Sequence, residues 1–282
     1  MINSNKKNAG IIGLGLIGGS MAKAIKEKNE YNVYGHDILE STLQAAQLTG
    51  AIDAPLDTVG LSRCDIVIIS LYPEATVDYI VANANGFKKG CIVIDCSGVK
   101  KHICEKINPI AQKHGFNFIG GHPMAGTQFW GFDSSRASLF KGASMILTPL
   151  ENTDAALIDT AKKFFLSLGF GDITFTTPEE HDRIIAYTSQ LAHVVSNAYV
   201  KSPTALSRKG FSAGSYKDMT RVAKLNEQMW TELFMDNKEN LVNELDILIE
   251  NLQQYKSALN KADCEKLRSL LREGKDTKRQ AG

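Results

Sequence analysis

Two glycine-containing segments in the first half of this sequence hold the residues best suited to chemistry. One is the run Gly13-Leu14-Gly15-Leu16-Ile17-Gly18, whose Gly-x-Gly-x-x-Gly spacing is typical of a turn that holds a dinucleotide phosphate. The other, residues 120–127, reads Gly-Gly-His-Pro-Met-Ala-Gly-Thr and carries His122 among glycines that leave room for a ligand. A neutral imidazole accepts a proton near neutral pH, so His122 could act as a base beside a carbon that loses hydride to a dinucleotide.

The sequence around the glycine run predicts the elements that such a turn requires. An apolar run at residues 9–12 predicts a strand before it, and residues 18–28 predict a helix after it. Gly13 permits a tight turn, Gly15 allows the backbone to approach a pyrophosphate, and Gly18 allows the helix to pack closely on the strand. The first N–H groups of the helix would then face the anion. We therefore expect a Rossmann-type dinucleotide site here.

Asp37 indicates which dinucleotide binds. It follows a second predicted strand, residues 32–36, and stands nineteen residues after Gly18. A carboxylate at this place can accept hydrogen bonds from the adenosine ribose hydroxyls, and its charge repels the extra phosphate of NADP. The expected cofactor is therefore NAD, although an aspartate here could instead cap the next helix. Ser70 and Leu71, at the end of a later predicted strand, should contact the cofactor at the same edge of the sheet.

The wider pattern of apolar runs predicts the fold. These runs alternate with helical patterns, as in parallel βαβ units. Further strands are predicted at residues 65–71, 91–96, 117–120, 143–148 and 172–176. After Thr177 the strand pattern ends and only helical patterns follow. We expect an α/β fold, in which residues 1–177 form a Rossmann-type, mostly parallel sheet and residues 178–282 form an all-α domain.

The all-α part carries an apolar stripe that must be covered. Its members recur at steps of three and four residues and are Leu241, Leu245, Leu248, Leu252, Tyr255 and Leu259. Either this chain or a second copy could cover the stripe, and we expect a homodimer formed through the helical domain. The polar tail, residues 274–282, has the composition of a disordered segment.

The composition argues against several partners and compartments. Lys and Arg number 32 and Asp and Glu 31, so neither nucleic acid nor a membrane is an expected partner. The five cysteines lack the spacing of a disulfide framework or a zinc site, which favours a reduced, cytoplasmic protein without a bound metal. A signal peptide is not expected at the N-terminus, because five glycines interrupt the apolar run of residues 10–19.

These segments, in their order and spacing, resemble the prephenate and arogenate dehydrogenase family of tyrosine biosynthesis. The similarity begins with GLGLIGGS from residue 13, Asp37 and GGHPMAGT at residues 120–127. It continues with HDRIIAYTSQLAH at residues 181–193, GSYKDMTRVA at residues 214–223, and Met229-Trp230. The resemblance thus covers nearly the whole chain.

The resemblance implies a reaction. Members of this family oxidise C4 of a cyclohexadienol with NAD or NADP while the ring carboxylate leaves as carbon dioxide. By resemblance, a neutral His122 accepts from the C4 hydroxyl and Arg221 grips a substrate carboxylate. Thr127, His193 and Gly214 match other substrate-binding positions. The implied function is NAD-dependent oxidative decarboxylation of prephenate to 4-hydroxyphenylpyruvate, with arogenate, the amino-acid counterpart, as the alternative substrate.

The sequence departs from the family pattern at two positions. Many members have a serine directly before Val-Lys, where it assists the histidine. This chain has Gly98 there and Ser97 one position earlier, so Ser97 is the second catalytic candidate. Gln190 stands where the family often has another histidine, which removes a titratable group from the helix motif.

Two other classes of protein compete with this interpretation. A two-domain β-hydroxy-acid dehydrogenase would use a lysine in its helical half. Lys201 and Lys217 lie there, but no surrounding pattern supports them, and the GGHPMAGT segment would have no role. A non-catalytic NAD-binding protein would have no need for both His122 and Arg221.

Overall fold

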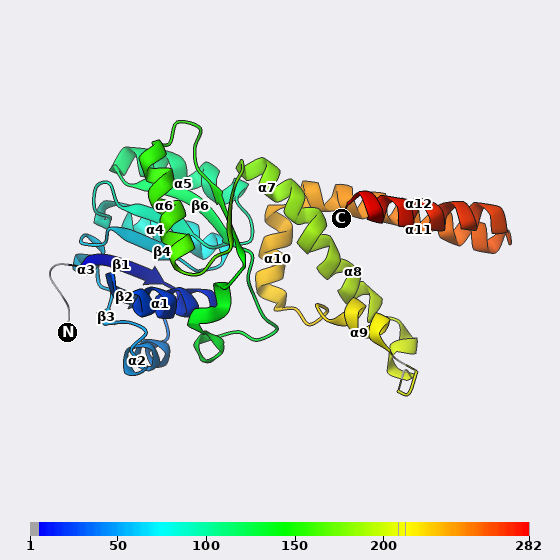
Figure 1. Cartoon of the computed structure of the whole chain (residues 1–282), viewed down its shortest axis with the longest axis horizontal. Coiled ribbons are helices and arrows are strands. Elements are labelled where there is room, and N and C mark those ends of the chain that lie inside the picture. Colours follow the sequence, from blue (N-terminus) through cyan, green and yellow to red (C-terminus); the bar gives the residue numbers. More distant parts are fainter. Residues whose placement is uncertain (1–5, 208, 212, 282) are drawn as a thin grey trace.

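All seven predicted strands lie in one eight-stranded sheet, whose additional strand is β3 (Figure 1). The computed structural model describes residues 6–207, 209–211 and 213–281. Across the sheet the order is β3-β2-β1-β4-β5-β6-β7-β8. Neighbouring strands are parallel except β6 and β7, which are antiparallel. The strands are β1 (Lys7–Ile12), β2 (Tyr31–His36), β3 (Ala54–Pro55), β4 (Ile66–Ile69), β5 (Ile92–Asp95), β6 (Asn117–Pro123), β7 (Ser144–Thr148) and β8 (Asp172–Phe175).

The two faces of the sheet carry separate apolar cores, because successive side chains of a strand point to opposite faces. In β4, Ile66 and Ile68 belong to one core, whereas Val67 and Ile69 belong to the other. The first core also contains apolar residues of α1, α2 and α6, and the second contains those of α3, α4 and α5. These helices are α1 (Leu16–Lys28), α2 (Glu40–Leu48), α3 (Thr58–Leu61), α4 (Pro73–Asn83), α5 (Lys101–His114) and α6 (Ala155–Ser167).

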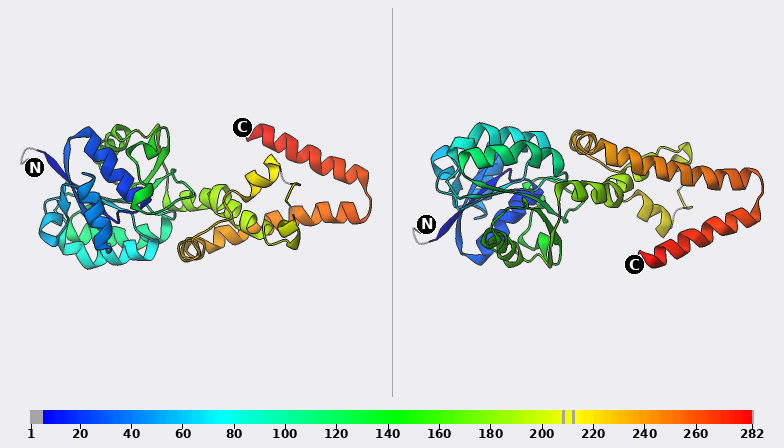
Figure 2. Two further views of the ribbon diagram at one scale, coloured as in Figure 1. Left: turned by 90° about the horizontal axis from the view of Figure 1, so that it is seen from below. Right: turned by 90° about the horizontal axis from the view of Figure 1, so that it is seen from above.

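After the sheet, the chain is helical. Thr177 caps the first helix by accepting a hydrogen bond from the backbone N–H of Glu180 at 3.2 Å, and Pro178 fits the first helical position. The helices are α7 (Pro178–Ile185), a π-helical segment (Ala186–Leu191), α8 (Ala192–Tyr199), α9 (Gly214–Thr220), α10 (Glu227–Asp236), α11 (Lys238–Asn260) and α12 (Cys264–Gln280). Figure 2 shows α11 and α12 diverging from their shared turn, at the end of the molecule away from the sheet.

The structure corrects the sequence prediction in two places. Strand β6 continues to Pro123, so His122 lies within the strand and pairs with Ile146 of β7. The tail predicted to be disordered is helical as far as Gln280. Its polarity fits a helix exposed on almost every side, and Asp263 caps that helix by accepting from the backbone N–H of Lys266 at 2.9 Å.

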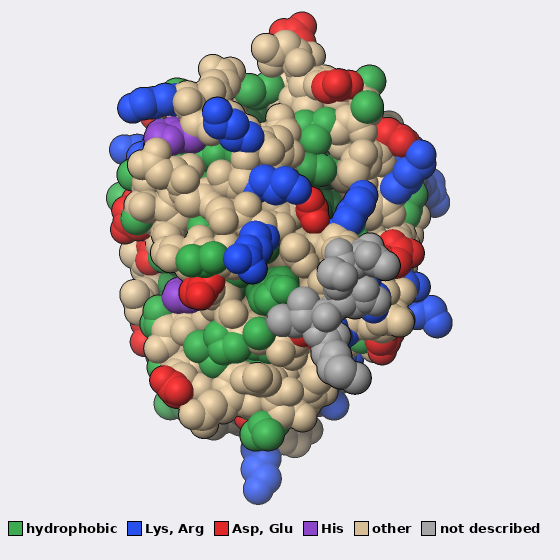
Figure 3. All heavy atoms as spheres, turned by 90° about the vertical axis from the view of Figure 1, so that its left-hand side faces the viewer, with side chains coloured by type: hydrophobic (Ala, Val, Ile, Leu, Met, Phe, Trp, Pro, Cys, Tyr) green, Lys and Arg blue, Asp and Glu red, His purple; other side chains and the backbone are tan. Residues whose placement is uncertain are grey.

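Charged side chains of both signs are interspersed on the face at the sheet-containing end of the molecule (Figure 3). This agrees with the near-zero formal net charge of +1. Within the described ranges, no helix combines the length and the apolar character needed to cross a membrane.

Candidate active site

The glycine turn lies at the carboxyl end of β1, and its geometry shows why glycine is needed. Gly13 has a positive φ of 81°, and a Cβ there would lie 2.6 Å from the Ser70 carbonyl oxygen. A Cβ on Gly18 would lie 1.8 Å from the Gly13 carbonyl oxygen. A Cβ on Gly15, in contrast, would have no heavy atom within 4 Å. Gly13 and Gly18 therefore form the tight turn, and the space beside Gly15 is open.

The start of α1 is suited to an anion. No side chain caps this end of the helix at Gly15, and no acidic residue lies in the first turn. The free N–H groups and the positive end of the helix dipole are thus available to a phosphate. Together with the open space beside Gly15, this arrangement fits the pyrophosphate of a dinucleotide.

Asp37 fixes the turn from the end of β2. Its Oδ2 accepts a hydrogen bond from the backbone N–H of Leu14 at 2.8 Å, and its Oδ1 accepts from Leu39 at 2.9 Å. The residue that caps α2 is Leu39, so the alternative that Asp37 is a helix N-cap is wrong. Asp37 is half-buried, so part of the residue is accessible beside the turn.

The ends of β4 and β5 continue this edge of the sheet. Ser70 and Leu71 lie against Gly13, within 2.6–3.1 Å of where its Cβ would be. Ser97 is buried, and its Oγ lies 3.3 Å from the Leu71 carbonyl oxygen and 3.4 Å from Thr76 Oγ1. Its hydroxyl is thus turned toward the connection between β4 and α4, and no hydrogen bond joins it to His122 among the described residues.

His122 lies near the end of β6 and contacts a second histidine. Its Nδ1 is 2.9 Å from Nε2 of His181, at the beginning of α7, and the two rings are inclined at 62°. The strand is held beside this point because the backbone N–H of Gly121 donates to Asp95 Oδ1 at 3.0 Å. His122 is half-buried, whereas His181 is fully buried.

A buried ion pair lies close enough to the two histidines to influence the pKa of both. Lys100 Nζ contacts Asp95 Oδ2, and both side chains are inaccessible to solvent. The same carboxylate accepts from the backbone N–H of Ser97 at 3.0 Å. This network places a fixed positive charge near His122 and His181 and ties the end of β5 to the start of α5.

These surroundings keep both imidazoles neutral. Burial, His181 and the Lys100 ammonium hold the pKa of His122 well below its usual value of 6.5. Burial also lowers the pKa of His181, even though Asp182 raises it in part. At neutral pH, His122 can therefore accept a hydrogen bond or a proton.

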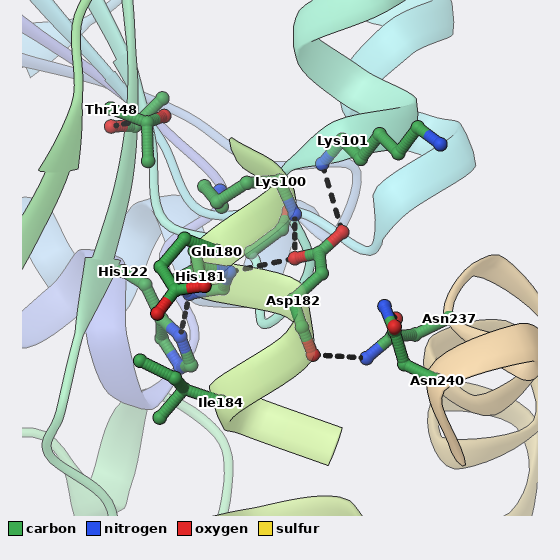
Figure 4. A network of polar contacts seen from close by, with 12 residues as sticks. Lys100, Lys101, His122, Thr148, Glu180, His181, Asp182, Ile184, Asn237 and Asn240 are labelled. Carbon is green, nitrogen blue, oxygen red and sulfur yellow. Dashed lines mark hydrogen bonds and ion pairs between the residues drawn. The ribbon is translucent and has the colours of Figure 1, made fainter. Parts of the chain in front are cut away.

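Asp182 connects His181 to both parts of the chain (Figure 4). Its Oδ1 lies 2.7 Å from His181 Nδ1 and accepts from the backbone N–H of Lys100 at 2.8 Å. Its Oδ2 accepts from the backbone N–H of Lys101 at 2.9 Å. The Asp182 carbonyl oxygen accepts from Asn237 Nδ2 at 2.8 Å, at the junction of α10 and α11. These contacts join the sheet-containing part to the helical part beside His122.

A second group of predicted residues gathers in the helical part. His193 Nδ1 donates to the Ser189 carbonyl oxygen at 2.8 Å, and its ring packs on Trp230 with centroids 3.9 Å apart. Burial lowers the pKa of His193, and the nearby Arg221 guanidinium lowers it further. Arg221 is exposed at the end of α9, so its guanidinium is available to a ligand.

Two predicted residues have no polar contact with this group. Gly214 begins α9 and is exposed. Thr127 lies in an exposed loop after β6, where its Oγ1 contacts the backbone of Phe129. In the same loop, the Trp130 ring lies 5.5 Å from Lys224 Nζ, which brings the loop toward the helical part.

One group among the described residues has the donors and spacing of a possible metal site. Ligand atoms of Glu74, His102 and Asp236 lie within 4.8 Å of one another. His102 Nε2 already lies 2.6 Å from Glu74 Oε1, and Lys106 Nζ lies 3.5 Å from the other oxygen of Glu74. The two basic side chains pair with Glu74, whereas Asp236 Oδ2 is buried without a hydrogen-bond partner among the described residues. We assign no chemistry to the cluster.

Comparisons with known proteins identify the family. Residues 21–171 match the family model described as prephenate dehydrogenase, nucleotide-binding domain, and residues 177–273 match prephenate dehydrogenase, dimerization domain. The chain belongs to the prephenate dehydrogenase family. Prephenate dehydrogenase of Bacillus subtilis is 28% identical over 284 residues, which cover 98% of this chain and 76% of that protein.

Solved structures of the family share the fold of the whole chain. Prephenate dehydrogenase of A. aeolicus, in complex with hydroxyphenyl propionate and NAD+, has a TM-score of 0.87 and 27% identity, covering 99% of this chain and 100% of that one. Synechocystis arogenate dehydrogenase has a TM-score of 0.81 and 26% identity, covering 98% and 100%. The Rossmann-type sheet followed by an all-α part is thus the architecture of this family.

The structure shows what Gln190 and Gly98, the two departures from the family pattern, contact. Gln190 is buried, where its Nε2 donates to the Leu233 carbonyl oxygen at 2.8 Å and its Oε1 accepts from Asn237 at 2.8 Å. It therefore joins the π-helical segment to α10. Gly98 lies against the same leucine, since a Cβ there would be 3.2 Å from Leu233 Cδ2. A serine at position 98 would crowd this contact.

Three residues of the hydrogen-bonded network around His122 are not assigned a role by the sequence motifs. Lys100, His181 and Asp182 were parts of quoted or neighbouring motifs, but no role was expected for their side chains. The adjacent pair His181-Asp182, a few residues after the predicted domain boundary at residue 177, is the signal that could have indicated them. A histidine beside a carboxylate is a common way to fix an imidazole tautomer.

Proposed function

We propose that this chain is an NAD-dependent prephenate dehydrogenase, which converts prephenate to 4-hydroxyphenylpyruvate in tyrosine biosynthesis. The observation that carries the proposal is a neutral His122 on the same sheet edge as the glycine turn. The A. aeolicus neighbour, whose structure holds NAD+ and hydroxyphenyl propionate, supports both the cofactor and the class of substrate.

The cofactor would be held by the residues at the ends of β1, β2 and β4. The turn from Gly13 to Gly18 would hold the pyrophosphate, Asp37 the adenosine ribose, and Ser70 and Leu71 the adjoining part of the dinucleotide. When bound, NAD supplies the acceptor for the hydride that leaves C4 of the substrate. The role of these residues would be to hold NAD in a fixed position and orientation.

His122 performs the proton chemistry. Its free Nε2 accepts the proton of the C4 hydroxyl as the C4 hydrogen departs as hydride, and the C4–O bond becomes a carbonyl. The bond from C1 to the ring carboxylate breaks and carbon dioxide leaves. The electron pair of that bond passes through the ring to the C4 oxygen, which takes up a proton, so the ring becomes aromatic and C4 again carries a hydroxyl. Aromatisation favours decarboxylation, so the enzyme mainly orients the substrate and accepts one proton. We retain Ser97 as a second catalytic candidate, because it lies on the same edge.

The helical part would hold the charged ends of the substrate. Arg221 offers a planar guanidinium that can bind a carboxylate with two hydrogen bonds. His193 lies close enough to Arg221 for the guanidinium charge to lower the pKa of the histidine, so the two side chains can line one site. We assign Thr127 and Gly214 to the same site from their places in the family motifs.

We further propose the organisation of the whole protein. The Rossmann domain would comprise residues 1–177 and the helical domain residues 178–282. The match to a dimerization domain supports a homodimer formed through the helical domain. All five cysteines are free, which is consistent with a reducing, cytoplasmic location.

One experiment tests the proposed activity: formation of reduced cofactor is followed with prephenate and with arogenate, each combined with NAD and with NADP. We expect the highest kcat/KM for prephenate with NAD. A preference for arogenate, the substrate named for the Synechocystis neighbour, would replace the proposed substrate. Absence of turnover with all four pairs would refute the proposed activity, and equal use of NADP would refute the role of Asp37.

A further inference from the structure

We infer that His181 and Asp182 are positioning residues, which fix the tautomer of His122 so that its bare Nε2 faces the substrate. This inference rests on the proposed function and deepens it. A chain of hydrogen bonds runs from the Asp182 carboxylate through His181 to His122 (Figure 4).

Asp182 is the fixed acceptor at the outer end. It is buried, and its two oxygens accept the backbone N–H groups of Lys100 and Lys101 at 2.8 and 2.9 Å. These N–H groups belong to the start of α5, where a carboxylate is favoured by the helix dipole. The carboxylate cannot rotate without losing both bonds, so it presents Oδ1 to His181 in one orientation.

The carboxylate determines the tautomer of His181. Its Oδ1 can only accept, so His181 Nδ1, 2.7 Å away, carries the hydrogen. Because burial and the Lys100 ammonium lower the pKa of His181, the ring is neutral and its Nε2 is bare. His181 Nε2 is therefore an acceptor directed at His122.

The tautomer of His122 follows from that of His181. Its Nδ1 lies 2.9 Å from the bare His181 Nε2, so His122 Nδ1 must carry the hydrogen and donate it. A neutral imidazole has only one N–H group, which leaves His122 Nε2 without a hydrogen. This is the state in which His122 can accept the proton of a substrate hydroxyl. In the opposite tautomer, Nε2 would be occupied by its own hydrogen.

The positioning residues belong to a different part of the chain from the residue they position. His122, Lys100 and Asp95 come from the strand edge, whereas His181 and Asp182 lie in α7. Asn237 holds the Asp182 backbone from the start of α11 at 2.8 Å. The helical part thus completes the proton acceptor of the Rossmann part, in addition to its proposed role in substrate binding.

The test compares two substitutions of His181 by steady-state kinetics. His181→Leu removes the acceptor, and we expect kcat for prephenate to fall by at least about 100-fold while KM changes less than about threefold. His181→Gln restores an acceptor, since its Oε1 can receive the His122 Nδ1 hydrogen, and should recover at least about tenfold of the lost kcat. The control His114→Gln, in a half-buried histidine at the end of α5, should match the wild type.

The substitution Asp182→Asn tests the role of Asp182. An amide N–H facing His181 would reverse both tautomers, so kcat should fall. The melting temperature should fall as well, because an amide oxygen can replace only one of the two carboxylate oxygens that accept the backbone N–H groups of Lys100 and Lys101. Unchanged kcat in this variant would remove Asp182 from the inference. Equal losses in His181→Leu and His181→Gln, or a kcat within threefold of wild type in His181→Leu, would overturn the role of His181.

A measurement without substrate separates this inference from the proposed activity. In protein labelled with nitrogen isotope in histidine, NMR reports which ring nitrogen carries hydrogen, and the His122 signals are assigned by their loss in His122→Asn. We expect hydrogen on Nδ1 in the wild type and a shift toward Nε2 in His181→Leu. Hydrogen on Nε2 of wild-type His122 would overturn the inference whatever the enzyme oxidises.

Discussion

His122 must be neutral to accept a proton, and its surroundings extend the pH range in which it is neutral. Burial and the Lys100 charge disfavour the imidazolium, so the pKa lies well below 6.5. As pH falls, the rate should stay constant through 6.5 and decline only below it, along a limb with one titrating group. The measurement is kcat against pH with prephenate and NAD. A limb centred at or above 6.5 would contradict the assignment.

Substitution of the same residue identifies the group that causes the limb. His122→Asn keeps a hydrogen-bonding side chain but cannot accept a proton near neutral pH, so we expect kcat to fall by about 10²–10⁴-fold. The acid limb should disappear from the residual activity. Affinity for NADH should remain within about threefold, which serves as the control for folding. Undiminished turnover would show that another group accepts the proton.

At the scale of an element, two glycines of the six-residue turn have different roles: Gly18 is needed for folding, whereas Gly15 is needed for binding the dinucleotide. Gly15→Ala places a methyl group in open space in the protein, so the melting temperature should change by less than about 2 °C, yet the methyl would meet the pyrophosphate. We expect the Kd for NADH to rise at least about tenfold. Gly18→Ala would instead meet the Gly13 carbonyl oxygen and should lower the melting temperature as well.

The outcome of this pair of variants is decisive because the two methyl groups are matched in size. Fluorescence titration with NADH measures binding, and thermal unfolding measures stability. If Gly15→Ala binds NADH as the wild type does, the pyrophosphate does not approach the backbone at Gly15. The bound dinucleotide would then have to lie in a different position relative to the turn.

The elements themselves were predictable where one short-range pattern decides the structure. The Ile66–Ile69 run is apolar at every position, as a strand buried on both faces must be. The two-residue β3 offers too few residues for any pattern, and its second residue is Pro55. The antiparallel direction of β7 depends on its pairing with β6, which no periodicity within residues 144–148 records.

In the active site, too, only the residues that belong to contiguous motifs were predictable. His122 and the glycine turn are contiguous motifs, and their spacing alone indicates a dinucleotide and a base. The contact between His122 and His181 joins residues 59 positions apart, from two differently folded parts of the chain. Only the packing of α7 against the start of α5 brings them together, so local sequence patterns cannot reveal the contact.

At the scale of the whole molecule, the apolar stripe of α11 is fully buried only at Leu241, near the start of the helix. Leu241 is buried, but Leu252 and Leu259 are 59% and 64% exposed. The stripe loses its cover as α11 and α12 extend away from the rest of the chain, although Tyr255 still contacts the backbone of Leu270 across the hairpin. Exposed apolar surface of this extent indicates an interface. A second copy, as the dimerization domain implies, would bury it.

A charge placed on this stripe should dissociate the homodimer. Wild-type protein should show twice the chain mass of 30.9 kDa by light scattering. Leu252→Glu would bury an unpaired carboxylate in the interface, so the dimer dissociation constant should rise at least about 100-fold. Leu48→Glu is the matched control, because Leu48 is 88% exposed at the end of α2 in the Rossmann part, and it should remain dimeric. A wild-type monomer, or a Leu252→Glu variant as stable a dimer as the control, would show that the stripe is not the interface.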